Sequence, residues 1–228
     1  MELSPYLEAV KSGDINAVKK HLKSGADINE TAKNGASALV YAAENDSMEL
    51  VKLLIDNGID PNLSTSMGGT AINRAAENNN VEMMKYLLEQ GAEVGDLALI
   101  VASREGNLKA VELLLEKGAN VNARQRWGQT ALMQATREGH SRVVKLLLQH
   151  EADVKLKDKN GETALSIAID NDQIDIAGQL KRSGATVVKS KTSAPVEAED
   201  EEDEEVSDEF EDLLDEEEIP EDVDLDED

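Results

Sequence analysis

The apolar and polar residues of this chain alternate in a pattern that repeats about every 33 residues over its first four-fifths. Each unit starts with Ser or Thr, or with Leu in the fourth unit, and has an apolar residue two positions later, an alanine five positions later and a turn-forming residue nine positions later. The steps between successive units are 33, 33, 27, 33 and 33 residues. Such a period is typical of a solenoid, in which each unit buries its apolar face only against its neighbours. The units start at Ser4, Ser37, Thr70, Leu97, Thr130 and Thr163.

The unit over residues 125–154 predicts two helices that follow a turn. Thr130 is placed to cap a first helix over residues 131–138, and Gly139 is placed to end it. A second helix over residues 141–149 has its apolar positions at helical spacing, including Val143, Val144 and Leu147. Residues 126–129, ahead of the cap, have the composition of a turn. The pattern therefore predicts an all-α chain of turn–helix–helix units.

Equivalent positions of the units carry the residue types that this arrangement needs. Alanine stands at the fifth position after every start, where a small side chain lets neighbouring helices approach closely. The turn between the helices holds Gly13, Asp46, Asn79, Gly106, Gly139 and Asp172, which tolerate a left-handed backbone. The second helix ends at glycine in every unit except the fifth, which has Glu151. We predict that Glu151 has a positive φ like its glycine siblings, and that Glu151→Gly stabilises the protein.

These residues resemble the ankyrin repeat, whose pattern is Thr-Pro-Leu-His, Ala-Ala, Gly-His, a Val-Leu-Leu helix and Gly-Ala-Asp-Val-Asn. Good copies here are Thr130-Ala131-Leu132 with Gly139-His140, and Gly118-Ala119-Asn120-Val121-Asn122. The resemblance covers about residues 3–187 and implies an ankyrin solenoid with β-hairpin fingers between the helix pairs. The expected domain spans residues 1–187, with repeats that start near 1, 32, 65, 95, 125 and 158.

The fourth unit is six residues shorter than its siblings. Only Gly95 and Asp96 separate Val94 from Leu97, so this unit lacks the length for a finger. The missing finger predicts a notch beside the fifth unit, which either admits a helix or loop of a partner or is a neutral deletion.

The formal charge of −25 is concentrated at one end of the chain. Residues 197–228 contain 22 acidic residues and no Lys or Arg, which leaves 26 acidic against 23 basic residues in the rest. We therefore predict a linker over residues 188–196 and a disordered acidic tail over residues 197–228. Phe210, Leu213 and Leu214 stand at helical spacing in this tail and are its predicted contact residues. Three roles stay open: a solubilising segment, a ligand for a basic protein, or a lid over the arginines of the fifth unit.

Composition argues against several classes of function. The chain has no cysteine, which excludes disulfides and thiolate metal sites. His21, His140 and His150 do not belong to a converging set of catalytic groups, and we expect no enzyme activity, cofactor or metal. A polyanionic tail mimics nucleic acid, so we expect no direct nucleic-acid binding. The first residues do not read as a signal peptide, and no apolar window suits a membrane span. We expect a monomer in the cytoplasm, or in the nucleus if the cell is eukaryotic.

The resemblance implies that the chain binds a protein on the finger tips and on the exposed face of the first helices. The sharpest predicted feature is Trp127, because Trp and Arg are enriched among binding hot spots. The alternative is that Trp127 only fastens its finger to the neighbouring finger. The favoured function is a non-enzymatic adaptor for a protein partner of unknown identity. The alternative is a chaperone-like or inhibitory protein whose tail shields a basic client or covers the array. The predicted contact residues are Lys33, Asn34, Glu44, Asn45, Ser66, Met67, Glu77, Asn78, Arg104, Arg124, Arg126, Trp127, Arg137, Lys159 and Asn160.

Overall fold

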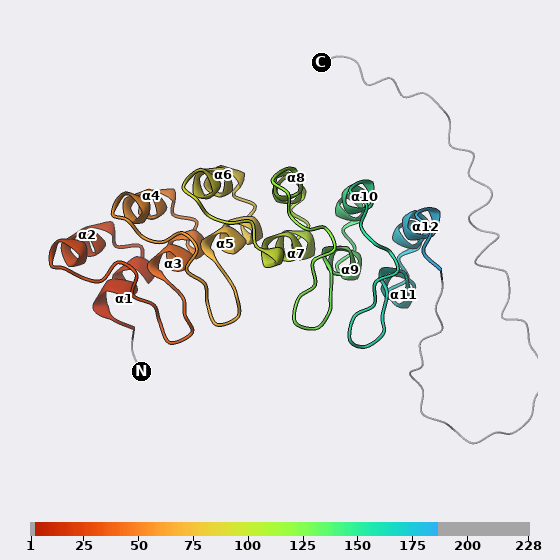
Figure 1. Ribbon diagram of the computed structural model, residues 1–228, viewed down its shortest axis with the longest axis horizontal. Helices are drawn as coiled ribbons and strands as arrows, with labels where there is room; N and C mark the ends of the chain where they lie inside the picture. Colours follow the sequence, from red (N-terminus) through yellow and green to blue (C-terminus); the bar gives the residue numbers. More distant parts are fainter. Residues whose placement is uncertain (1–2, 187–228) are drawn as a thin grey trace, which may run out of the picture. The chain divides into compact units, whose positions relative to one another are not determined.

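A computed structural model describes residues 3–186, and this part of the chain contains twelve α-helices (Figure 1). Consecutive helices form pairs, as the repeating pattern predicts. The helices are α1 (Pro5–Lys11), α2 (Ile15–Lys23), α3 (Ala38–Glu44), α4 (Met48–Asp56), α5 (Ala71–Glu77), α6 (Val81–Glu89), α7 (Asp96–Arg104), α8 (Leu108–Glu116), α9 (Ala131–Arg137), α10 (Ser141–Gln149), α11 (Ala164–Asp170) and α12 (Ile174–Arg182).

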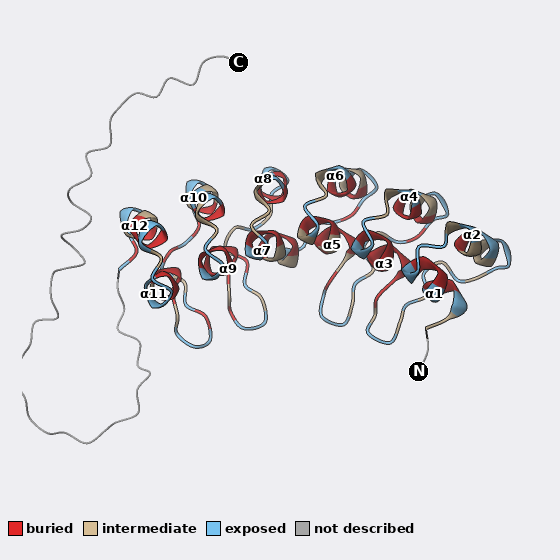
Figure 2. Cartoon of the chain, turned by 180° about the vertical axis from the view of Figure 1, so that it is seen from behind, coloured by how far each residue is buried: buried red, intermediate tan, exposed pale blue. Residues whose placement is uncertain are grey.

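The helix pairs stack so that the first helices form one layer and the second helices another (Figure 1). Each first helix packs against the next first helix, from α1 to α11. The small size of one side chain permits this packing, because the alanine five positions after each start is buried. Ala42, Ala75, Ala102 and Ala135 are all 0 % exposed. Most residues of the first helices are buried, for example six of the seven in α3, whereas a second helix such as α4 buries only one face (Figure 2).

Side-chain caps and left-handed turn residues fix the ends of the helices. The Thr130 hydroxyl accepts a hydrogen bond of 3.3 Å from the Met133 backbone N–H, and Ser37 caps α3 in the same way. The turn residues between paired helices all have positive φ, including Asp46 at 55° and Asn79 at 53°. Glu151 has φ 62°, as predicted from its glycine siblings.

Four short loops, which we call fingers A to D, project from the layer of first helices (Figure 1). Each is closed by two backbone hydrogen bonds, which in finger A join Gly35 N–H to Ala32 and Ala32 N–H to Ala36, both at 2.8 Å. Within the described residues the fingers are not the β-hairpins that the family resemblance implies, because none of them contains a strand. In residues 3–186 the only β-pairing is an isolated bridge between Thr31 and Ser37. Finger A is residues 32–36, finger B 65–69, finger C 125–129 and finger D 158–162.

The fingers are joined in two pairs. In the first pair, Ser66 N–H of finger B donates to the Asn34 carbonyl of finger A at 2.8 Å. In the second, Lys159 N–H of finger D donates to the Trp127 carbonyl of finger C at 3.0 Å. The connection between α6 and α7 carries no finger, as its length predicts (Figure 1).

The shortened unit changes the start of α7. This helix begins at Asp96 with Gly95 as its cap, so Leu97 lies inside the helix where the sibling units place a capping residue. A Leu97 methyl group lies 3.3 Å from the place where a side chain on Gly68 would begin, and Leu97 therefore packs beside finger B. The predicted linker, the acidic tail and its residues Phe210, Leu213 and Leu214 lie outside the described residues.

Candidate protein-binding surface

The fifteen predicted contact residues lie on the fingers and at the C-terminal ends of the first helices. All of them are exposed except Glu77, which is half-buried. The fingers are exposed at their tips (Figure 2). Exposure alone does not make these residues available to a partner, because several of them already bind groups of their own chain.

Asn45 and Asn78 hydrogen bond to the preceding helix pair. The Asn45 amide donates to the carbonyls of Val10 (3.3 Å) and Lys11 (2.9 Å) at the end of α1. The Asn78 amide does the same at the end of α3, with distances of 3.1 Å to Ala43 and 3.3 Å to Glu44. The last carbonyl groups of a helix have no hydrogen-bond donor within that helix, and the two Asn amides donate to them here. Their amide groups therefore hold the stack together.

Charged residues on the first helices pair with one another. Glu77 accepts from Arg74 on its own helix, and from Arg104 on α7 at 3.2 Å. Arg137 of α9 pairs with Glu162 of finger D at 3.0 Å. These pairs are partly exposed, so each contributes at most about 1 kcal/mol to stability. Glu77, Arg104 and Arg137 thus already have partners within the chain, whereas Glu44 has no ion pair among the described residues.

Arg124 also acts within its own chain. Its Nε donates to the Gly128 carbonyl at 3.2 Å, and an Nη atom donates to the Lys157 carbonyl, which leads into finger D. The guanidinium thus braces finger C and links it to its neighbour. Arg124 nevertheless remains exposed to solvent.

Trp127 and Met67 are the most exposed large apolar side chains among residues 3–186, at 61 % and 69 %. They occupy the same place, directly before the glycine with positive φ, in fingers C and B. The Trp127 ring has the Arg126 guanidinium 5.8 Å and the Lys159 ammonium 5.7 Å from its centre. The Trp127 backbone fastens finger C to finger D, while its ring stays largely open to solvent.

Comparison with known protein families agrees with this architecture. A family description of ankyrin repeats, built from three copies, matches residues 7–98 and again residues 99–191. The chain belongs to the ankyrin-repeat family. A search of curated proteins finds no match. Ankyrin repeats are in general modules for protein–protein interaction, so an interaction role follows from the family.

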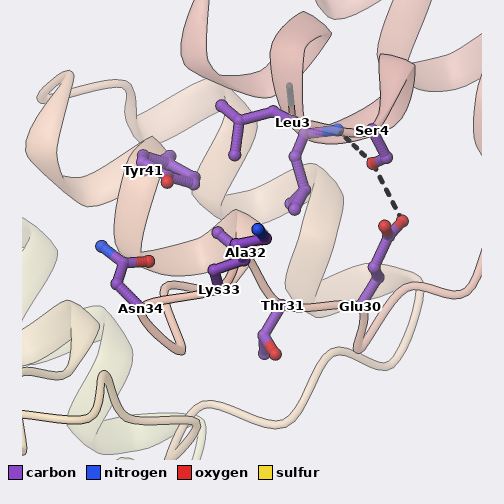
Figure 3. Close-up of a pocket in the computed structure, with 9 residues that line it drawn as sticks. Leu3, Ser4, Glu30, Thr31, Ala32, Lys33, Asn34 and Tyr41 are labelled. Atoms are coloured by element: carbon purple, nitrogen blue, oxygen red, sulfur yellow. Dashed lines mark hydrogen bonds between the residues drawn. The ribbon is translucent and has the colours of Figure 1, made fainter. Parts of the chain in front are cut away.

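The first helix pair of the ankyrin array borders a small hollow of about 320 Å³ beside finger A (Figure 3). The Ser4 hydroxyl donates to a Glu30 carboxylate oxygen at 3.0 Å on one side of the hollow, and Tyr41 lies on the other side (Figure 3). Tyr6 is buried nearby in the same helix pair, and burial, with the charges of Glu30 and Asp27, raises its pKa to about 12. The residues that line the hollow are a mixture of polar and apolar side chains, and they do not form a set of catalytic groups.

The histidines of the ankyrin array stand apart from one another. His140 binds the Arg104 carbonyl at the end of α7. In residues 3–186 no group of three or more His, Asp or Glu residues is placed to hold a metal ion. No helix in the same residues is both long and apolar enough to cross a membrane.

Sequence reasoning missed two features of this surface. It did not anticipate that the amides of Asn45 and Asn78 are engaged within the stack. It also omitted Lys155 and Lys157, which are exposed on the approach to finger D. The alternation of lysine with other residues over 155–159 is the signal that could have identified them.

Proposed function

We propose that this chain is a non-enzymatic adaptor that docks a protein partner on the tips of fingers B, C and D. The observation that carries the proposal is the open Trp127 ring at the tip of finger C. A Trp flanked by cations has the composition of an interface hot spot.

Met67 extends this surface to the other side of the missing finger. It occupies in finger B the place that Trp127 occupies in finger C, and α7 lies between the helices that carry the two fingers. Neighbouring helices pack about 8–10 Å apart, so fingers separated by one fingerless unit stand roughly 16–20 Å apart at their bases. A helix with its side chains is about 10–12 Å wide. The notch thus suits one helix or loop of a partner.

The test is affinity purification from the native cell with the full chain and with Trp127→Ala and Met67→Ala variants. Lys109→Ala is a matched control, because Lys109 is exposed on α8 in the other helix layer. We expect one set of bound proteins to be lost with the finger variants and kept with the control. A bound set that is the same for all four proteins would exclude docking on the fingers.

A second candidate function rests on the acidic segment. Its 22 acidic residues within positions 197–228, without a single Lys or Arg, favour a shield for a basic client protein or a cover for the array. A chain that ends at residue 195 separates the two candidates. Loss of basic partners alone supports shielding, whereas retention of all partners supports docking by the array.

A further inference from the structure

The two finger pairs differ in charge. The eight-residue segments that contain fingers A and B, residues 29–36 and 62–69, hold one acidic and one basic residue between them. The matching segments of fingers C and D, residues 122–129 and 155–162, hold five basic and two acidic residues. All five basic residues are exposed, and they are Arg124, Arg126, Lys155, Lys157 and Lys159.

The two acidic residues of the second pair do not neutralise these cations. Asp158 is 6 % exposed, and its carboxylate accepts the backbone N–H groups of Asn160 (2.8 Å) and Glu162 (3.0 Å). Glu162 pairs with Arg137 of α9. Within residues 3–186 no ion pair involves Arg126, Lys155, Lys157 or Lys159. The outer side of fingers C and D is therefore positive.

Trp127 stands in the middle of this positive surface. Arg126 and Lys159 approach its ring from the two fingers, so two like charges flank one exposed aromatic side chain. A carboxylate that binds beside the ring would be attracted by both charges. The ring offers apolar area beside that carboxylate. This combination fits a peptide that carries acidic residues next to an apolar one.

We propose that fingers C and D bind an acidic segment of a partner protein, with an apolar side chain of that segment covering Trp127. The inference rests on the proposed docking function and names the chemistry of the partner. An extended nucleic acid fits less well, because a nucleic-acid-binding domain has a broadly basic face. Here residues 1–196 hold 26 acidic and 23 basic residues, so the array has no broad excess of positive charge, and the five exposed cations form a local group on and beside two fingers. A short acidic peptide matches a patch of that size.

The experiment is a titration of the full chain with synthetic peptides in 50 mM salt. The test peptide has twelve residues, eight of them Glu or Asp, with one Phe and one Leu at its centre. A second peptide replaces the Phe and Leu by Ser, and a third replaces every acidic residue by Lys. The emission of Trp127 reports on the site directly, because it is the only Trp of the chain. Anisotropy of a labelled peptide gives the dissociation constants of all variants.

We expect the test peptide to shift the Trp127 emission to shorter wavelength and to bind about tenfold more tightly than the Ser peptide. Trp127→Ala weakens binding by about 10- to 30-fold, which is the range of a hot-spot residue. Arg126→Glu and Lys159→Glu each weaken it by about 5- to 10-fold, and the effect shrinks in 0.5 M salt because the screening length falls to about 4 Å. Lys109→Glu, the control with the same charge change on α8, leaves binding within about twofold. Thermal unfolding of each variant checks that the stack is intact.

Three results overturn the proposal. Equal binding of the test peptide by the wild type and by Trp127→Ala would place the peptide elsewhere. Tighter binding of the Lys peptide, or of a single-stranded oligonucleotide of similar charge, that is lost with Trp127→Ala would assign the surface to another chemistry. Binding that is detected only after residues 197–228 are removed would assign the surface to that segment of the chain itself. In each case a finger-dependent partner in the affinity purification leaves the adaptor function standing, whereas absence of any such partner rejects that function independently.

Discussion

The imidazole ring of His140 lies directly against Gly106. A Cβ atom on Gly106 would meet the Cε1 and Nδ1 atoms of the ring at 2.6 Å and its Cγ atom at 2.9 Å. The ring is held there because its Nε2 atom lies 2.9 Å from the Arg104 carbonyl oxygen. A carbonyl oxygen only accepts hydrogen bonds, so Nε2 carries the proton. His140 thereby completes the end of α7, a helix of the preceding pair.

Gly106→Ala is expected to lower stability by about 2–4 kcal/mol. Part of the lost stability comes from placing a Cβ on a left-handed backbone at φ 71°, and the larger part comes from displacing the His140 ring. Gly118→Ala is the control, because Gly118 has φ 84° with no atom near the added Cβ, so its loss is backbone strain alone. Denaturant unfolding gives both values. In a double-mutant cycle His140→Ala should recover most of the difference, and equal losses for the two glycines would contradict the contact.

Glu151→Gly is expected to stabilise the protein by about 0.5–1 kcal/mol, because a side chain at positive φ strains the backbone. The φ of 62° at Glu151 matches the five glycines at equivalent helix ends in sign, and those glycines have open space around them. For an array of this size the thermal midpoint should rise by about 1–4 °C. Scanning calorimetry of the two proteins measures it. An unchanged or lower midpoint is incompatible with the strained turn.

Asn78→Ala is expected to cost about 1–2 kcal/mol, since it leaves the Ala43 and Glu44 carbonyls without their amide donor. Asn171 is the matched control. It holds the same place after α11, is exposed, and makes no side-chain hydrogen bond within the described residues. Asn171→Ala should stay within about 0.5 kcal/mol of the wild type. Chemical denaturation gives the unfolding free energies of both variants. Similar losses for Asn78→Ala and Asn171→Ala would argue against a role of Asn78 in the stack.

Ser103→Ala is expected to raise stability by up to about 1 kcal/mol. Ser103 is 0 % exposed, and its hydroxyl has no hydrogen-bond partner among the described residues. A buried hydroxyl without a partner is destabilising, and Ala43 and Ala76 fill the equivalent place elsewhere. Ser37→Ala, at an equally buried serine that caps α3, should instead lose about 1 kcal/mol. Urea unfolding should give opposite signs for the two variants.

Stability at alkaline pH should depend on Tyr6. Its pKa is about 12 in the folded protein, against an ordinary tyrosine value of 10.0. The unfolded chain therefore loses the phenolic proton first, and stability falls as the pH rises from 10 to 12, at about 1.4 kcal/mol per pH unit. Below pH 10 both states keep the proton and the contribution is complete. The difference between the unfolding free energies of wild type and Tyr6→Phe should thus be flat up to pH 9 and change above pH 10. A difference that stays constant from pH 9 to pH 12 would contradict the raised pKa of Tyr6.

The periodic part of the fold follows from the sequence because each element depends on residues within its own unit. Thr130 caps a helix, Ala135 allows close packing and Gly139 ends the helix without reference to distant residues. The positive φ of Glu151 was predictable because glycine stands at the equivalent position of the other units. In contrast, the length of α7 was not predictable, because only the removal of the finger frees Asp96 to join the helix.

The candidate site was harder to predict from the sequence. Exposure at helix ends and finger tips follows from the repeat, and it correctly marked Trp127 and Met67 as exposed. The hydrogen bonds of Asn45 and Asn78 run between units, and they depend on how far one pair of helices is displaced along the next. That displacement is a property of the stack and has no signature in the residues themselves. Whether Trp127 contacts a partner stays a prediction.

The shortened unit interrupts a series of hydrogen bonds between successive units as well as the row of fingers. Asn29, Asn62 and Asn122 each accept a backbone N–H of the next unit, from Asp60 (3.0 Å), Glu93 (2.8 Å) and Asp153 (2.8 Å). Gly95 holds the equivalent place ahead of α7 and has no side chain to continue the series. Between the halves this asparagine hydrogen bond is missing, and the helices, the turns at their far ends and the contact of Leu97 with finger B make the connection. The two finger pairs are therefore held in register by helix packing, of α5 with α7 and of α7 with α9, and not by a hydrogen bond between their loops.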